Sequence, residues 1–322
     1  MEALDQQFGV TEAGTTVDAE IRAGVTTFLT MAYILLVNPA MLSIAGIPFD
    51  DALFATAIAA FVGCTIMGLY ANLPFALAPG MGLNAYFTFA VVLGMGIPWQ
   101  VALAAVFVEG IIFLLMSVPA IPVIGGWRTI MINSIPTDLK IATGAGIGMF
   151  LAIIGLREMG WIRDDGATLV NLGVTESFTY EHGALISMVC LIAIAVMMAR
   201  GIKGAIIIGI GIASVWGWAV GAYDPYNDFM AGGAGWGTPY AEWPSAVFGF
   251  VGLPDESLMA ATGALGDIAD GAGWGDFLLV MITFLFVDIF DTAGTLYSVG
   301  RQAGYVDEND ELMNSDEAFV SD

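Results

Sequence analysis

Eight apolar runs, each a candidate for a membrane-crossing helix, dominate this chain of 322 residues. A helix needs about 20 apolar residues to cross the hydrocarbon core of a bilayer. Hydrophobic residues make up 58% of the sequence and charged residues only 12%, against about 25% charged residues in soluble domains. The pattern predicts an all-α polytopic membrane protein, with runs at 22–44, 52–70, 72–98, 99–120, 141–156, 183–199, 204–222 and 277–299.

The charges lie mostly outside these runs. The net charge is −23, with 31 acidic and 8 basic residues. Such an acidic chain is not expected to bind nucleic acid, and its surface charge is typical of adaptation to high salt or of general solubility. The cysteines and the single histidine have no metal-ligand spacing, so neither a metal nor a cofactor is expected.

The few basic residues predict the orientation of the chain. Six fall on one side of the eight spans and two, Arg157 and Arg163, on the other. Cytoplasmic loops carry the excess of Lys and Arg. The sequence therefore predicts a multi-pass protein of the cytoplasmic membrane with its N-terminus inside; the six are Arg22, Arg128, Lys140, Arg200, Lys203 and Arg301.

The last run, 277–299, carries two carboxylates near its middle. Asp288 and Asp291 are three residues apart, so both lie on one face of a helix, together with Phe284. A charged group at the bilayer centre costs roughly 3 kcal/mol and normally faces protein or water. Apart from Arg22 at the very start of the first run, no Lys or Arg lies within the runs to pair with these acids, so their neutral form is favoured. Asp291, Asp288 and Glu109 of the fourth run are therefore candidates for binding a coupling proton.

The third run is interrupted by Pro74, Pro79, Gly80 and Gly82. Broken backbone at membrane depth is tolerated only where protein or water satisfies its polar groups, and such segments often form the substrate sites of transporters. A helix that restarts near Gly82 would direct its amide groups at that site, with Asn84 in its first turn. A kinked helix with Asn84 as a simple cap fits this segment equally well.

The connections between the runs carry weaker signals. Residues 121–140 form a mixed connection, and 223–276 form a long acidic loop with apolar patches that suit a surface-lying helix. The glycine-rich stretches at 144–148 and 209–214 are interpreted as close helix packing, because no strand precedes them as in a dinucleotide-binding loop.

Four blocks of the sequence resemble one known family. They are AGVTTFLTMAYILLVNPAML, LAPGMGLNAYFTF, IPTDLKIATGAGIGMFLAIIGL and FLFVDIFDTAGTL. In this order they are similar to the AzgA-like purine permeases of the nucleobase–ascorbate transporter superfamily, over about residues 20–312. The resemblance implies an inverted-repeat nucleobase transporter fold of fourteen spans, in which a core domain moves against a gate domain. The third and tenth spans of that fold are half-helices joined to short extended strands.

The resemblance also implies a domain division. It predicts an acidic tail at 1–20, core spans one to four at 21–121, gate spans five to seven at 122–222, an extracellular loop at 223–276, core span eight at 277–300 and an acidic cytoplasmic segment at 301–322. On this basis the chain is a C-terminally truncated fragment, holding one seven-span repeat and the first span of the second. The family's second essential acid, in span ten, would lie beyond it.

The same resemblance assigns the candidate substrate-binding residues. Asp291 matches the family's acid-x-x-Gly pattern with Gly294, and Asn84 matches an asparagine of the broken third span. Asp288, one turn earlier, is a second candidate. Phe284 or Phe75 would stack on the base, since bases stack on aromatic faces.

The function expected from this resemblance is import of adenine, guanine or hypoxanthine, coupled to protons or to sodium. The expected partners are a purine nucleobase, the coupling ion, the lipid bilayer and a second copy of the chain, as a homodimer. The alternatives are a transporter of uracil or xanthine, an anion transporter of the same fold, and an intramembrane aspartyl hydrolase. The hydrolase is disfavoured because its two acids should come from different helices, whereas Asp288 and Asp291 share one.

Overall fold

The structure is a computed structural model that describes residues 7–11, 14–118, 120–121, 125–172, 183–202, 204–219, 254, 257, 259–266, 268, 273–307 and 311–322. The chain divides into two compact units. The first contains residues 1–28, 32–148 and 251–322, and the second contains residues 29–31 and 149–250.

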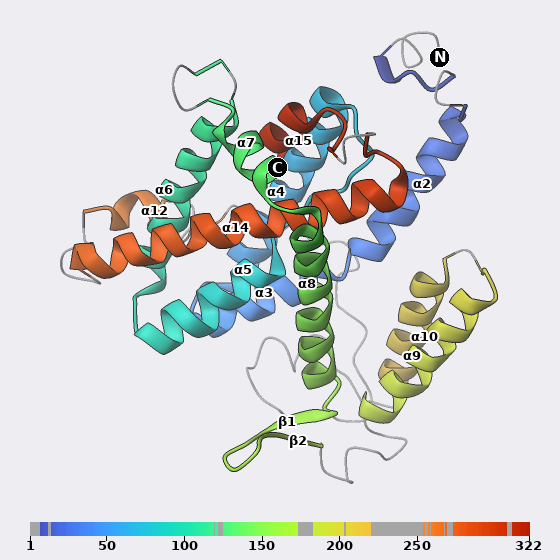
Figure 1. Cartoon of the computed structure of the whole chain (residues 1–322). Coiled ribbons are helices and arrows are strands. Elements are labelled where there is room, and N and C mark those ends of the chain that lie inside the picture. Colours follow the sequence, from blue (N-terminus) through green and yellow to red (C-terminus); the bar gives the residue numbers. More distant parts are fainter. Residues whose placement is uncertain are drawn as a thin grey trace. The chain divides into compact units, whose positions relative to one another are not determined.

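Helices form at the positions of all eight apolar runs (Figure 1). Among the residues that the structure describes, five helical segments, at 17–44, 49–71, 99–117, 137–157 and 273–303, are long and apolar enough to cross a membrane, and three shorter apolar helices lie at 81–94, 184–199 and 205–217. The prediction of a largely helical polytopic membrane protein is confirmed. The helices are α2 (Val17–Met31), α3 (Ile34–Ile44), α4 (Phe49–Ile66), η1 (Met67–Ala71), α5 (Met81–Ala85), η2 (Tyr86–Gly94), α6 (Trp99–Ser117), α8 (Thr137–Glu158), α9 (Gly183–Ala199), α10 (Ala205–Ala219) and α14 (Gly273–Ala303), of which η1 and η2 are π-helical.

The first helical segment starts before the predicted end of the tail at residue 20. Thr16 caps α2 by accepting a hydrogen bond from the amide of Ala19, at 3.3 Å, which satisfies one of the free donors at the start of a helix. The segment is interrupted at residues 32–33, and Pro39 lies inside α3. A proline inside a helix usually bends it, but here the interruption lies six residues before the Asn38-Pro39 pair.

Residues 72–80 leave the helical conformation between η1 and α5. Asn72 ends η1 with φ of 51°, a left-handed conformation that asparagine tolerates, and Pro74 and Pro79 disfavour helix in the residues before them. The thiol of Cys64, on α4, bonds both backbone groups of Leu77, at 3.1 Å to the amide nitrogen and 3.2 Å to the carbonyl oxygen. The Cys64 side chain thus supplies hydrogen-bond partners for the backbone of Leu77, which lies outside a helix.

The helix α14 is the centre of the first unit. It packs against α6, which also contacts the short helix α12 (Ala260–Ala264) (Figure 1). It also meets α8 closely, because a methyl group on Gly294 would lie 2.9 Å from Cγ2 of Thr143 and 3.2 Å from the amide nitrogen of Gly144. The prediction that the glycines at 144–148 serve helix packing is thus confirmed at Gly144.

Two short helices of the first unit were not predicted. The expected connection at 121–140 contains α7 (Trp127–Ser134), and the expected solvated segment at 301–322 contains α15 (Ser315–Ser321). Ala318 and Phe319 of α15 are buried. The side-chain amide of Asn314, just before α15, donates to the carbonyl of Ala71 at 2.9 Å. The acidic C-terminal stretch therefore belongs to the core of this unit.

The predicted loop at 223–276 is described only in part, since residues 220–253 lie outside the described residues. Near its end, the amide of Ser257 donates to Oδ2 of Asp51 at 2.9 Å. Ala264 and Ile268 are buried in the core that α6 and α14 share. The described part of this loop thus packs into the first unit, whereas a surface-lying helix was predicted.

The second unit contains α9, α10 and a hairpin of β1 (Ile162–Asp165) and β2 (Leu169–Leu172). The strands are antiparallel, with Ile162 opposite Leu172 and Asp165 opposite Leu169. A methyl group on Gly209 would overlap the side chain of Ile194. The stretch at 209–214 therefore serves close packing of α10 on α9, as predicted.

Candidate functional site

Asp291 of α14 lies against the start of α5. A methyl group on Gly80, the residue before α5, would lie 2.9 Å from Oδ2 of Asp291. The side chain of Asp291 makes no hydrogen bond or ion pair with the residues that the structure describes. The backbone carbonyl of Asp291 accepts a hydrogen bond of 2.7 Å from the hydroxyl of Thr295. A partly buried carboxylate therefore meets the first turn of a helix with its acceptor oxygens uncommitted.

Asn84 stands one turn further along the same helix. Gly80 and Asn84 are four residues apart, joined by a hydrogen bond of 3.1 Å from the amide of Asn84 to the carbonyl of Gly80, so both lie on one face of the helix. The side-chain amide of Asn84 donates to Oδ1 of Asn38 on α3. The structure thus brings Asp291 and the face that carries Asn84 to the same start of α5.

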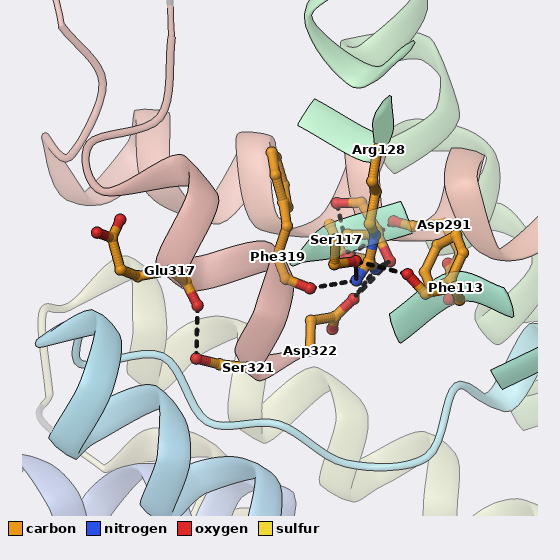
Figure 2. Close-up of polar contacts among 10 residues, drawn as sticks. Phe113, Ser117, Arg128, Asp291, Glu317, Phe319, Ser321 and Asp322 are labelled. Atoms are coloured by element: carbon orange, nitrogen blue, oxygen red, sulfur yellow. Dashed lines mark hydrogen bonds and ion pairs between the residues drawn. The ribbon is translucent and has the colours of Figure 1, made fainter. Parts of the chain in front are cut away.

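Arg128 of α7 forms the centre of a second polar cluster (Figure 2). This residue is almost fully buried, with 1% of its surface exposed. It donates to the carbonyl of Phe319, to Thr292 at 2.9 Å, to Ser117 at 3.3 Å and to Asp322 at 2.5 Å. Oδ2 of Asp322 also accepts a hydrogen bond of 2.6 Å from Thr292. One guanidinium thereby joins α6, α7, α14 and α15.

Asp288 and Glu109 each lie one helical turn from a residue that Arg128 contacts. The guanidinium carbon is 3.6 Å from the ring centre of Phe113, four residues after Glu109 on α6. On α14, Thr292 follows Asp288 by four residues, and both carboxyl groups are within electrostatic reach of Arg128. Residues four apart are neighbours on a helix surface, so the cluster places a cation beside two of the three acids.

The electrostatics of Arg128 follow from this arrangement. Burial lowers the pKa of the Arg128 guanidinium, and the nearby charges of Asp322, Asp288 and Glu109 act in the opposite direction. Arginine keeps its proton in proteins nonetheless, so Arg128 is a fixed positive charge. Two buried atoms, Nε of Arg128 and Oε1 of Glu109, have no hydrogen-bond partner among the described residues.

The two aromatic candidates pack in the interior. The ring centre of Phe284 is 5.5 Å from that of Tyr86 in an edge-to-face contact and 6.4 Å from that of Phe87. Phe75 contacts Tyr305 edge to face at 5.7 Å and lies beside Gly300. Gly300 is nine residues beyond Asp291 on α14, or about 13 Å at 1.5 Å per residue. Phe75 is therefore remote from Asp291 along the helix.

The structure groups the predicted residues in two places. Asp291 and Asn84 meet at the start of α5, while Asp288 and Glu109 lie beside Arg128. Sequence reasoning did not single out Arg128, because it stands in a polar connection outside the apolar runs. Within the described residues, no group of three or more His, Cys, Asp or Glu side chains could hold a metal ion.

This fold, with carboxyl groups buried between apolar helices, defines a polytopic membrane protein with a polar site inside its helical core. The chain belongs to the permease family, whose model matches residues 18–321. This membership confirms the predicted resemblance to the permeases and the prediction that the chain is not an enzyme.

The chain is similar along nearly its whole length to several permeases. It is 37% identical to the guanine/hypoxanthine permease PbuG of Bacillus subtilis, over 98% of the chain and 66% of the relative. It is 35% identical to the adenine permease AdeP of Escherichia coli, over 99% of the chain and 64% of the relative. A second guanine/hypoxanthine permease of Bacillus subtilis, PbuO, is 37% identical over 98% of the chain and 66% of the relative. The chain thus spans slightly less than two-thirds of the length of these relatives.

Proposed function

We propose that this chain contributes a purine-binding site to a secondary transporter that imports adenine, guanine or hypoxanthine. The names of the relatives, guanine/hypoxanthine and adenine permeases, support this substrate class. The structural observation that carries the proposal is the position of the uncommitted Asp291 carboxylate against Gly80, at the start of the helix that holds Asn84.

The proposed binding mode follows from the hydrogen-bonding capacity of these groups. A carboxylate only accepts hydrogen bonds, so Asp291 takes N–H groups of the purine. Asn84 has both donors and an acceptor and pairs with the neighbouring edge of the ring. Residues 72–80 then correspond to the extended part of a broken third span, in a core domain that also contains α14.

Proton coupling is the second part of the proposal. Asp288 and Glu109 lie beside the fixed charge of Arg128, and Asp291 lies three residues from Asp288. A proton that binds within this group of acids changes the charge next to the purine site, which is what symport requires. Uptake should then collapse with a protonophore and persist when sodium is replaced by potassium. The opposite pattern would assign sodium as the coupling ion.

The substrate assignment is tested with the protein at its full natural length, reconstituted in proteoliposomes. Radiolabelled hypoxanthine uptake should be competed by adenine and guanine and not by uracil or sulfate; competition by sulfate would favour the anion transporter. Asp291→Asn should weaken purine binding at least tenfold, because an amide replaces one acceptor oxygen with a donor. An Asp291→Asn protein with unchanged affinity for hypoxanthine would exclude this role of Asp291.

A further inference from the structure

We propose that Asn38 and Thr56 are positioning residues that fix the orientation of the Asn84 amide and thereby set which edge of a purine the site accepts. The inference rests on the proposed function above, because it concerns the recognition of that ligand. It rests structurally on a buried chain of hydrogen bonds that links α5, α3 and α4.

The hydrogen bonds of this chain run in one direction. The hydroxyl of Thr56 has a single proton, and it donates that proton to the carbonyl of Ala52 at 2.6 Å. The Thr56 oxygen can therefore only accept a hydrogen bond from Asn38. Asn38 presents its NH₂ group to this oxygen, at 2.8 Å. Oδ1 of Asn38 then points the other way and accepts from the side-chain amide of Asn84.

Burial makes a reversal of the Asn38 amide alone costly. Asn38 and Thr56 each expose only 2% of their surface, so water does not replace a lost partner. If the Asn38 amide were rotated by 180°, its oxygen would face the oxygen of Thr56, whose proton is already donated to Ala52. Its NH₂ group would then face the NH₂ group of Asn84. Both contacts would be repulsive, and a buried polar group without a partner is costly.

The orientation of the Asn38 amide affects the ligand through Asn84. One N–H of its amide is committed to Asn38, and Asn84 is only partly buried. Its Oδ1 and second N–H remain, in a fixed order, as one acceptor and one donor. This pair fits a ring edge that carries a donor beside an acceptor, as the amide edge of an oxopurine or the amidine edge of an aminopurine does. A ligand that carries only acceptors finds one matching group at most.

Oxopurines and aminopurines present that edge in opposite order. At N1 and the 6-position, hypoxanthine offers a donor beside an acceptor, whereas adenine offers an acceptor beside a donor. In one ligand pose beside Asp291, a fixed Asn84 amide therefore discriminates between the two bases. An Asn84 amide that can turn accommodates both.

The test measures the ratio of the dissociation constants of hypoxanthine and adenine, on the full-length protein in nanodiscs. Thr56→Val removes the acceptor for Asn38 while it keeps the shape of the side chain, and Thr56→Ser keeps the hydroxyl. Thr65→Val is the matched control, since the hydroxyl of Thr65 on the same helix donates to the carbonyl of Phe61 at 2.6 Å but is exposed.

We expect the ratio of the two dissociation constants in Thr56→Val to be closer to one than in the natural protein, by a factor of about three or more. Thr56→Ser and Thr65→Val should leave this ratio within about twofold of its value in the natural protein. A lower affinity for both bases with an unchanged ratio would overturn the inference and leave the proposed function intact, because it would show a structural role only. Absence of purine binding by the natural protein would overturn both.

Discussion

Oδ2 of Asp291 occupies the space that a β-carbon on Gly80 would need, with 2.9 Å between the two positions. The backbone of Gly80 has φ of −67°, which any residue can adopt. The absence of a side chain at residue 80, rather than backbone freedom, is therefore what lets the carboxylate of α14 approach α5.

Gly80→Ala should displace the Asp291 carboxylate without unfolding the protein. We expect purine affinity to fall about tenfold, which corresponds to about 1.4 kcal/mol of binding free energy. The measurement is a purine binding isotherm, together with the thermal unfolding midpoint of the same sample. Gly82→Ala is the matched control, since a methyl group there meets nothing within 4 Å. An equal loss in both variants would show that glycine matters here for helix geometry instead.

Arg128→Met should be strongly destabilising. Removing the guanidinium leaves Asp322, Thr292 and the carbonyl of Phe319 without their partner in a buried site. Breaking a buried ion pair on one side typically costs about 3–5 kcal/mol, so the unfolding midpoint in detergent should fall markedly. Arg200→Met is the control, because Arg200 is exposed. Similar midpoints for the two variants would contradict a structural role of the Arg128 cluster.

Gly294→Ala should push α8 away from α14. The added methyl group would lie 2.9 Å from Cγ2 of Thr143 and 3.2 Å from the backbone of Gly144, and the backbone cannot rotate aside. Overpacking of this kind costs about 1–3 kcal/mol, measurable as a lower unfolding midpoint. Gly146→Ala, two residues from the contact, has open space around it and should be neutral or slightly stabilising. Destabilisation by Gly146→Ala alone would argue against this helix contact.

Asp165 in the hairpin of the second unit should keep its charge to a lower pH than an ordinary aspartate. Hydrogen bonds from the amides of Thr168 and Ala167, and then from the side chains of Thr168 and Asn171, lower the pKa of Asp165 below its ordinary value of 3.8. Because the pKa of Asp165 is lower in the folded state, the ionised carboxylate stabilises the hairpin at pH values above 3.8. This contribution is lost as the pH falls through the lowered pKa of the folded state. An NMR titration of the carboxyl carbon should show the depressed midpoint, and Asn171→Ala should raise it. An unchanged midpoint in Asn171→Ala would remove that side chain from the explanation.

The sequence located the apolar helices well because that signal is local, although three of the eight described at these positions are shorter than a membrane span. A run of about 20 apolar residues has few alternatives to a membrane-crossing or fully buried helix. The acid pair of α14 stood out for the same reason, since Asp288 and Asp291 are charges in an apolar run. The interruption at residues 72–80 followed from Pro74 and Pro79, whose effect on the backbone is also local.

The polar partners could not be predicted, because they depend on contacts between distant parts of the chain. Arg128 looked like an ordinary loop cation until α7 placed it beside Thr292, 164 residues later. Asn38 precedes a proline within an apolar run, with nothing local to mark it, and its bond to Asn84 crosses 46 residues. The helix α15 was hidden by its acidic composition, since two buried residues, Ala318 and Phe319, are too short a signal to predict packing.

The Arg128 cluster also constrains the order in which this protein is made. The carbonyl of Phe319 and the carboxylate of Asp322 follow Arg128 by 191 and 194 residues. At a synthesis rate of about 5–20 residues per second, roughly 10–40 s separate the emergence of the guanidinium from that of its counter-ion. During that interval α6 and α7 carry a cation that the finished protein buries. Their final packing therefore waits until α14 and α15 have been synthesised, and the first unit closes around a charge that was made long before its partner.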